Sequence, residues 1–282
     1  MIKKIVFNVL NALGGILLMS LCQYAGTFVA SMVKDELLNA LVYVVVYVIL
    51  FVLLGTLYAK KVLKMTTNEL GISVKNINPI LFAIGFGLPV VVLLLYAFVI
   101  PGQIINNNDR SVVFAFVKGL LKVGLPAGIG EELLFRGLIM RYMKKSFGTV
   151  IAVVIPAVVF ALLHIGNMTS FSITTLVLLI LAGASVSMLF SMMALKSGSL
   201  IPGMVAHAIW NTLIIGDLFG IGAIVNGVPN SALICIMPNT TNEFITGGEF
   251  GVEAAIISSA VYLFAAFLVG FTKSKNPKTA EE

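Results

Sequence analysis

Residues 128–137, GIGEELLFRG, carry three ionisable side chains inside an otherwise apolar stretch. Ionisable groups at membrane depth are costly, and they are usually functional or paired with one another. On a helix, Glu132 and Arg136 lie one turn apart on the same face, so we expect them to form a structural ion pair. Glu131 is rotated by about 100° from Glu132. Its carboxylate is therefore predicted to be available for chemistry.

Both histidines of the chain also lie in apolar stretches. His164 ends the string FALLH, and His207 lies four residues before Asn211 in the string HAIWN, so the latter two share a helix face. With a rise of about 1.5 Å per residue, each of these side chains reaches nearly the same depth as Glu131 in its own predicted helix. Three separate helices therefore bring uncommon polar groups to one level of the membrane.

These residue types could hydrolyse a peptide bond in two ways. Glu131 beside a histidine could activate a water molecule as a general base, while the other histidine and the Asn211 amide donate hydrogen bonds to the developing oxyanion. Alternatively, Glu131, His164 and His207 could hold a metal ion such as zinc, whose bound water attacks. The HExxH string of zinc proteases is absent from the sequence, and no Ser-His-Asp set presents itself.

The composition is that of a membrane protein. Of the 282 residues, 59% are hydrophobic and only 11% are charged, whereas soluble domains carry about 25% charged residues. The formal net charge of +6 does not indicate a nucleic-acid partner, because the basic residues cluster at the ends of apolar segments. Two isolated cysteines, Cys22 and Cys235, give neither a disulfide framework nor a zinc spacing. The expected partners are therefore the lipid bilayer and a peptide or membrane-protein substrate.

Eight apolar segments are long enough to cross a bilayer, which takes about 20 helical residues. We therefore predict an all-α, polytopic membrane protein with eight transmembrane helices around an intramembrane polar cavity. Residues 1–111 hold three helices, 112–222 hold the four helices of a catalytic core, and 223–282 hold a loop, the last helix and a tail. The predicted helices are 6–32, 38–59, 79–100, 112–142, 148–168, 173–195, 199–222 and 252–272.

The basic residues predict how the chain lies in the membrane. Thirteen of the 18 Lys and Arg residues fall on one side of the eight helices, and an excess of positive charge marks the cytoplasmic side. Both termini are therefore predicted to be cytoplasmic. The ratio of 15 lysines to 3 arginines is typical of an AT-rich bacterial genome and indicates a bacterial plasma membrane. The thirteen residues are Lys3, Lys4, Lys60, Lys61, Lys64, Lys75, Arg141, Lys144, Lys145, Lys196, Lys273, Lys275 and Lys278.

Lys118 and Lys122 do not fit this pattern, since they lie one turn apart early in the fourth predicted helix. Either they belong to an amphipathic or kinked piece with a break at Gly124 and Pro126, or they line a polar cavity. Residues 223–251 form either a cap or a simple connector.

Several other residues near the motifs are predicted to serve packing alone. The GIG string before Glu131 is expected to permit close helix packing, because small residues let membrane helices approach one another. The same prediction covers the aromatic side chains Phe135, Phe160 and Trp210.

The sequence resembles the CPBP family of intramembrane proteases, which includes type II CAAX prenyl endopeptidases and proteins of bacteriocin processing and self-immunity. EELLFR matches the EExxxR motif of that family, FALLH its FxxxH motif and HAIWN its HxxxN motif, in the same order. The similar core covers about residues 112–222. The resemblance implies eight helices around a catalytic cavity that lies within the membrane and opens toward the cytoplasmic side.

The resemblance also implies roles for the catalytic candidates. Glu131 and His164 would activate water, while His207 and Asn211 would stabilise the oxyanion. No cofactor is favoured, because the asparagine serves better as an amide donor than as part of a zinc site. Zinc held by Glu131, His164 and His207 is the alternative.

Glu132 and Arg136 would be the structural pair of such a site. The predicted function is an intramembrane endopeptidase that cuts peptides or membrane proteins near the cytoplasmic leaflet. The rival is a non-catalytic membrane protein that acts in bacteriocin immunity or as a scaffold. A transporter is the weaker third reading, because the sequence shows no internal repeat.

Overall fold

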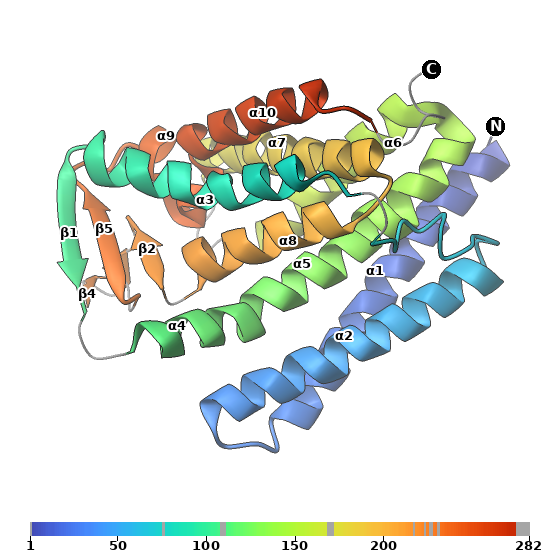
Figure 1. Ribbon diagram of the computed structural model, residues 1–282, viewed down its shortest axis with the longest axis horizontal. Coiled ribbons are helices and arrows are strands. Elements are labelled where there is room, and N and C mark those ends of the chain that lie inside the picture. The colour runs from blue at the N-terminus through green and yellow to red at the C-terminus, as the bar shows by residue number, and fades with distance from the viewer. Residues whose placement is uncertain are drawn as a thin grey trace.

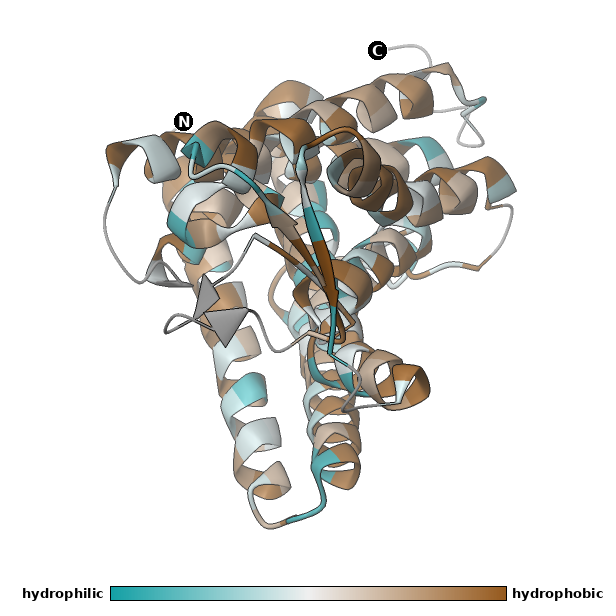
Figure 2. Ribbon diagram, turned by 90° about the vertical axis from the view of Figure 1, so that its left-hand side faces the viewer, coloured by the Kyte–Doolittle hydropathy of each residue, from teal (hydrophilic) through white to brown (hydrophobic). Residues whose placement is uncertain are grey.

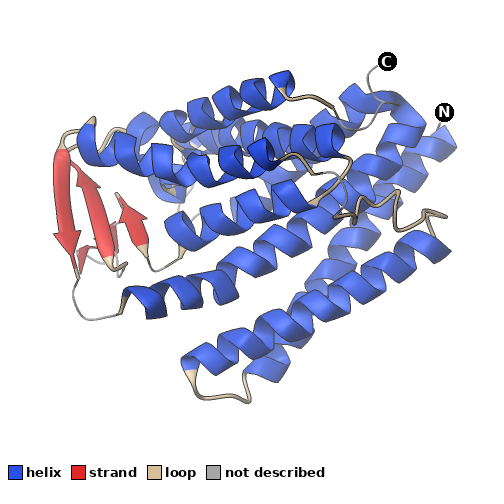
Figure 3. Ribbon diagram, in the orientation of Figure 1, coloured by secondary structure: helices blue, strands red, loops and turns tan. Residues whose placement is uncertain are grey.

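The computed structural model is a bundle of long helices with a small sheet at one end (Figure 1, Figure 3). It describes residues 2–74, 77–107, 111–167, 172–216, 218–222, 224–225, 228–229 and 232–274. Outside residues 112–166, its longest helices are α1 (Ile2–Ala30), α2 (Glu36–Lys61), α3 (Pro79–Phe98), α7 (Ile173–Ser197) and α10 (Ile256–Phe271).

Local sequence signals set where these helices begin. Asp35 precedes α2, and its side chain accepts a hydrogen bond from the amide of Leu38. Asn78 caps α3 in the same way through the amide of Ile80, and Pro79 occupies the first turn, where its missing N–H does no harm.

Residues 112–166 form the longest helical stretch, which carries Glu131. α4 (Val112–Gly119), α5 (Leu125–Glu132) and α6 (Arg141–Leu163) follow one another through two π-helical segments, Leu120–Gly124 and Leu133–Met140. Gly148 interrupts α6 with a positive φ of 78°, which divides the stretch into two helices. The break expected near Gly124 and Pro126 is therefore a π-helical turn, and the chain direction reverses at Gly148 instead.

Five described helices are long and apolar enough to cross a membrane, namely α1, α2, α3, α7 and the stretch 112–166. α8 (Ile201–Trp210) continues through a π-helical segment to Ile215, and both this helix and α10 are shorter apolar helices. When the stretch 112–166 is divided at Gly148, each of the eight predicted helices has a helical counterpart in the structure. The predicted end of the seventh helix at residue 222 is wrong, because the backbone turns extended at Gly216.

The structure is mostly helical, as predicted, but the connections at one end form short strands that the all-α prediction lacked. β1 (Gly102–Asn106) pairs antiparallel with β5 (Ile234–Pro238), and β2 (Phe219–Ile221) pairs parallel with β5 on its other edge. β3 (Ile224–Val225) and β4 (Val228–Pro229) form a separate short pair. Strand pairing satisfies main-chain N–H and C=O groups next to the membrane, and strands of two to five residues give too short a pattern to be predicted from sequence.

The surface of the bundle is apolar and part of its interior is polar. Figure 2 shows that hydrophobic residues prevail on most helices, with hydrophilic bands between them. On α1, Leu10, Leu13 and Leu17 are exposed, while Asn8 and Asn11 on the same helix are buried. Exposed apolar area of this extent is not tolerated in water. The described chain is therefore an integral membrane protein.

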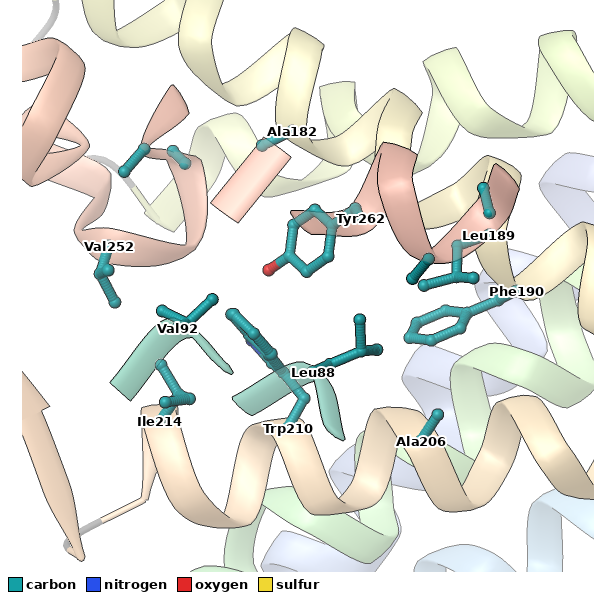
Figure 4. Packing of buried hydrophobic residues seen from close by; sticks show 14 of the residues in the cluster. Leu88, Val92, Ala182, Leu189, Phe190, Ala206, Trp210, Ile214, Val252 and Tyr262 are labelled. Atoms are coloured by element: carbon teal, nitrogen blue, oxygen red, sulfur yellow. The ribbon is translucent and has the colours of Figure 1, made fainter. Parts of the chain in front are cut away.

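Two groups of buried apolar side chains hold the bundle together. One joins α1, α2, the segment 133–143 and α6. The other joins α3, α7, α8 and α10, and it includes Leu88, Val92, Ala182, Leu189, Phe190, Ala206, Trp210, Ile214 and Tyr262 (Figure 4).

The start of α1 and the end of α10 lie at the same end of the bundle, opposite the sheet (Figure 1). The connection from α2 to α3 lies at that end as well. The predicted topology requires this arrangement, because it puts both termini and the connection after the second helix on the same side of the membrane. Lys75, Lys275 and Lys278, which entered that prediction, lie outside the described residues.

The connection between α2 and α3 is attached to the neighbouring helix ends. Glu69 accepts hydrogen bonds from the amide of Thr66 at 2.7 Å and from Nζ of Lys145 at 2.6 Å. Thr66 Oγ1 in turn accepts from the Glu69 amide at 3.2 Å, which completes a capping box. Lys145, and then the Thr66 amide and hydroxyl, lower the pKa of the Glu69 carboxyl to about 2.

We expect the stability that Glu69 contributes to be lost in acid. The folded pKa of about 2 lies below the unfolded value of about 4.3. The contribution is therefore fully present above about pH 5 and disappears as the pH falls toward about 2. Glu69→Gln should lower the unfolding temperature in detergent slightly at pH 7, as for any exposed ion pair. A difference from wild type that stays constant down to about pH 2 would contradict this role.

Candidate active site

The GIG string lets α5 pass closely between α8 and α2 (Figure 1). A methyl group at Gly128 would lie 2.6 Å from the carbonyl oxygen of Met204 on α8. One at Gly130 would overlap the hydroxyl of Tyr47 on α2. The predicted close packing is confirmed, and it brings the glutamates that follow against α8.

Glu132 and Arg136 form a buried ion pair, each with a side chain that is 1% exposed. Arg136 Nη1 donates to Glu132 Oε1 at 2.8 Å, and Nη2 donates to the hydroxyl of Ser187 on α7 at 2.8 Å. The guanidinium carbon also lies 5.3 Å from the ring centre of Phe160 and 5.4 Å from that of Phe190. Hydrogen bonds and aromatic faces thus compensate a charge that would be costly alone.

His207 contacts both glutamates. Its Nδ1 lies 3.0 Å from Glu132 Oε1, and an ionised carboxylate can only accept, so Nδ1 carries the proton. Its Nε2 lies 3.9 Å from Glu131 Oε2, and its ring stacks on Phe190 at 5.1 Å between centroids. Glu132 therefore fixes the ring so that Nε2 faces Glu131.

His164 is oriented by its own helix. Its Nδ1 lies 2.8 Å from the carbonyl oxygen of Phe160, one turn earlier, so Nδ1 donates and the neutral ring keeps a lone pair on Nε2. The ring packs on Phe160 at 4.6 Å and on Phe250 at 6.2 Å between centroids.

One small cavity gathers the four catalytic candidates, Glu131, His164, His207 and Asn211. Glu131 lies next to His207, and its buried Oε2 atom has no hydrogen-bond partner among the described residues. His164 and Asn211 reach the same space, but within the described part of the chain neither is hydrogen-bonded to Glu131 or His207.

Side chains outside the motifs complete the wall of the cavity. Phe250, Glu253 and Tyr262 come from the segment before α10 and from α10 itself. Sequence reasoning missed them, and the only signal was an acidic residue directly before the last apolar stretch. Phe160 and Trp210, predicted to serve packing alone, also line the cavity. Residues 223–251 are thus more than a connector, since Phe250 borders the site.

The zinc alternative finds no ready ligand set. In the ranges that the structure describes, no three His, Cys, Asp or Glu side chains gather closely enough to hold a metal ion. Glu131, His164 and His207 would have to move toward one another to do so.

The two lysines left open by the sequence have different surroundings. Lys118 is buried and its Nζ lies 2.6 Å from Glu36 Oε1, so it ties α4 to the start of α2. Lys122 borders a second cavity, together with Thr27, Ser31 and Tyr43. Neither lysine lines the cavity of Glu131.

We expect Gly128→Ala to separate α5 from α8. The added methyl would press on main-chain atoms of α8, and such overpacking costs about 1–3 kcal/mol. The unfolding temperature in detergent should fall, and with it any activity that needs Glu131 near His207. Gly87→Ala on α3 is the control, because a methyl there has no atom within 4 Å. Equal behaviour of the two variants would contradict the packing role.

Neighbouring glutamates should respond differently to the same substitution. Glu132→Gln removes the carboxylate from a buried arginine, a change that costs about 3–5 kcal/mol. Glu131 is 18% exposed and forms no such pair. Thermal unfolding should therefore show a much larger loss for Glu132→Gln than for Glu131→Gln. The reverse order would overturn the division of roles.

Part of the chain matches a known protein family. Residues 111–213 match the model of the family described as type II CAAX prenyl endopeptidase Rce1-like. The matched range holds Glu131, Glu132, Arg136, His164, His207 and Asn211. No curated protein and no solved structure matches the chain. The membrane protein therefore contains a domain of the Rce1-like type II CAAX prenyl endopeptidase (CPBP) family.

Proposed function

We propose that the protein is an intramembrane endopeptidase that hydrolyses peptides or membrane proteins within a bacterial plasma membrane. Membership of the family implies a peptidase. The observation that carries the finer proposal is the shared cavity of Glu131, His164, His207 and Asn211 within the family-matched segment.

Glu131 is the best-placed general base. Its Oε2 atom is buried in the wall of the cavity without a hydrogen-bond partner among the described residues, so it is open to accept a proton from a water molecule. The free Nε2 of His164 would hold that water by a second hydrogen bond. Water oxygen then attacks the carbonyl carbon while its proton passes to Glu131.

His207 and Asn211 would stabilise the oxyanion that forms. Nδ1 of His207 is committed to Glu132, so donation to the oxyanion requires a second proton on Nε2. The negative charges of Glu132 and Glu131 would balance that imidazolium. The Asn211 amide supplies the other donor. As the C–N bond breaks, Glu131 returns its proton to the leaving amine, which completes the hydrolysis.

The test is cleavage of a reporter peptide library by the purified protein in lipid. Removal of one acid–base group typically costs about 100-fold or more, so Glu131→Gln and His207→Ala should each lose at least that much in kcat/KM. Wild-type activity should survive a strong chelator. Glu249→Gln, an exposed carboxylate that does not line the cavity, should behave as wild type.

Other outcomes would change the assignment. Activity lost on chelation and restored by zinc would make the protein a metalloprotease. Full activity of the Glu131 variant would place the chemistry elsewhere. A wild-type protein that cleaves nothing, with a biological effect that persists in Glu131→Gln, would favour the non-catalytic immunity or scaffold role.

A further inference from the structure

We propose that Glu253 is a specificity-determining residue that binds a basic side chain of the substrate, lysine or arginine, beside the scissile bond. This inference rests on the proposed peptidase function. It assigns to the cavity a second part, with Glu253, Phe250, Trp210 and Tyr262 as its wall, next to the catalytic groups.

The cavity holds two carboxyl groups, and no lysine or arginine of the described lining pairs with them. Burial, and then the nearby Glu131 carboxylate, raise the pKa of Glu253 to about 8, so its carboxyl keeps a proton at pH 7 until a cation beside it favours the ionised form. Glu131 and Glu253 both line it, and its other lining residues are apolar or aromatic side chains, two histidines and one asparagine. Arg136 is not among the lining residues, and its nitrogens contact Glu132 and Ser187. Among the described lining residues there is thus no lysine or arginine to pair with Glu253.

The fold directs Glu253 into this space. Val252 and Ala254 on either side of it are buried, and the Ser258 hydroxyl donates to the carbonyl of Val252 at 2.6 Å. The turn is sharp because Gly251 has a φ of 93°. Figure 4 shows Val252 packed toward the buried cluster around Val92. The buried neighbours therefore leave the Glu253 side chain facing the cavity.

The preceding segment is anchored as well. In α9 (Glu243–Thr246), the Glu243 carboxylate accepts from the hydroxyls of Ser172 at 3.2 Å and Thr175 at 3.4 Å. The hydroxyl of Tyr96 donates to the carbonyl of Ile245. These contacts tie the segment before Glu253 to α7 and α3, so the backbone that leads to Glu253 is anchored before any substrate arrives.

Aromatic rings make the surroundings of Glu253 suitable for a cation. The rings of Trp210 and Tyr262 meet edge to face at 5.0 Å between centroids, and Phe250 lines the same cavity. An ammonium or guanidinium group gains from aromatic faces and from a carboxylate at once, most of all where water is scarce. An acidic substrate side chain would lie near the Glu131 carboxylate and would gain no ion pair from Glu253, so it is disfavoured. The chemistry therefore selects a basic group over an apolar or acidic one.

Matched peptide sets test this selection. Peptides that wild type cleaves are remade with lysine, norleucine or glutamate at each position flanking the scissile bond. At one position, wild type should prefer lysine to norleucine by about tenfold or more in kcat/KM, as for a buried charge pair. Glu253→Gln should abolish the preference, Glu253→Asp should keep part of it, and Glu249→Gln should keep all of it. If Glu253 had only a structural role, Glu253→Gln would lower kcat/KM for the lysine and norleucine peptides alike and leave their ratio unchanged.

A binding measurement separates this inference from the proposed function. Glu131→Gln protein in nanodiscs is titrated by calorimetry with apolar peptides that carry one lysine, norleucine or glutamate, with and without the added substitution Glu253→Gln. Lysine-selective binding that needs Glu253 would support the site even if wild type cleaves nothing. Cleavage without charge preference would overturn the site while the peptidase stands. Absence of charge preference in both measurements would also overturn it.

Discussion

A single buried carboxylate oxygen, Oε1 of Glu132, accepts hydrogen bonds from both Arg136 and His207. Without it, a guanidinium would lie in the interior uncompensated, and the imidazole would lose the contact that orients its Nε2. An ion pair of this kind adds little net stability over apolar packing, but it cannot lose one partner cheaply. The geometry around Glu131 thus depends on a neighbour that lies outside the cavity lining.

Small residues make this arrangement possible in a membrane. Lipid tails are as apolar as the helices, so helices associate through close van der Waals contact and polar bonds. Gly128 gives α8 that contact, and two more such contacts occur elsewhere. A methyl on Gly85 would lie 2.7 Å from Cβ of Ala206, and one on Gly183 would lie 2.7 Å from Cβ of Ala161. The helices that surround the cavity are therefore joined by glycine on one side and alanine or main chain on the other.

Much of the bundle could be predicted from sequence, because bilayer thickness sets helix length and hydropathy marks the helices. The candidate site could be predicted because residues four apart share a helix face. This spacing relates Glu132 to Arg136 and His207 to Asn211. What the sequence did not reveal depends on contacts distant in the chain. Glu253 reaches the cavity only because its loop folds back.

The sheet and the bent helices escaped prediction for other physical reasons. Strands β1 and β5 are separated by more than a hundred residues, and their pairing leaves no local pattern. The π-helical turns around residues 120–124 and 133–140 look like ordinary helix in sequence, since one extra residue per turn does not change composition. Phe160 orients His164 through its carbonyl oxygen and its ring, and this contact could not be predicted from the sequence.

The sheet also bears on which parts of the sequence can change without disturbing the helices. β5 is paired on both edges, with β1 after α3 and with β2 after α8, so the chain between β5 and α10 starts from a strand that is fixed on both sides. The motif residues on the helices lie outside that loop. Insertions or exchanges within residues 239–255 can therefore reshape one wall of the cavity while the catalytic helices keep their register. In the proposed peptidase, substrate range and chemistry would be encoded in separable parts of one chain.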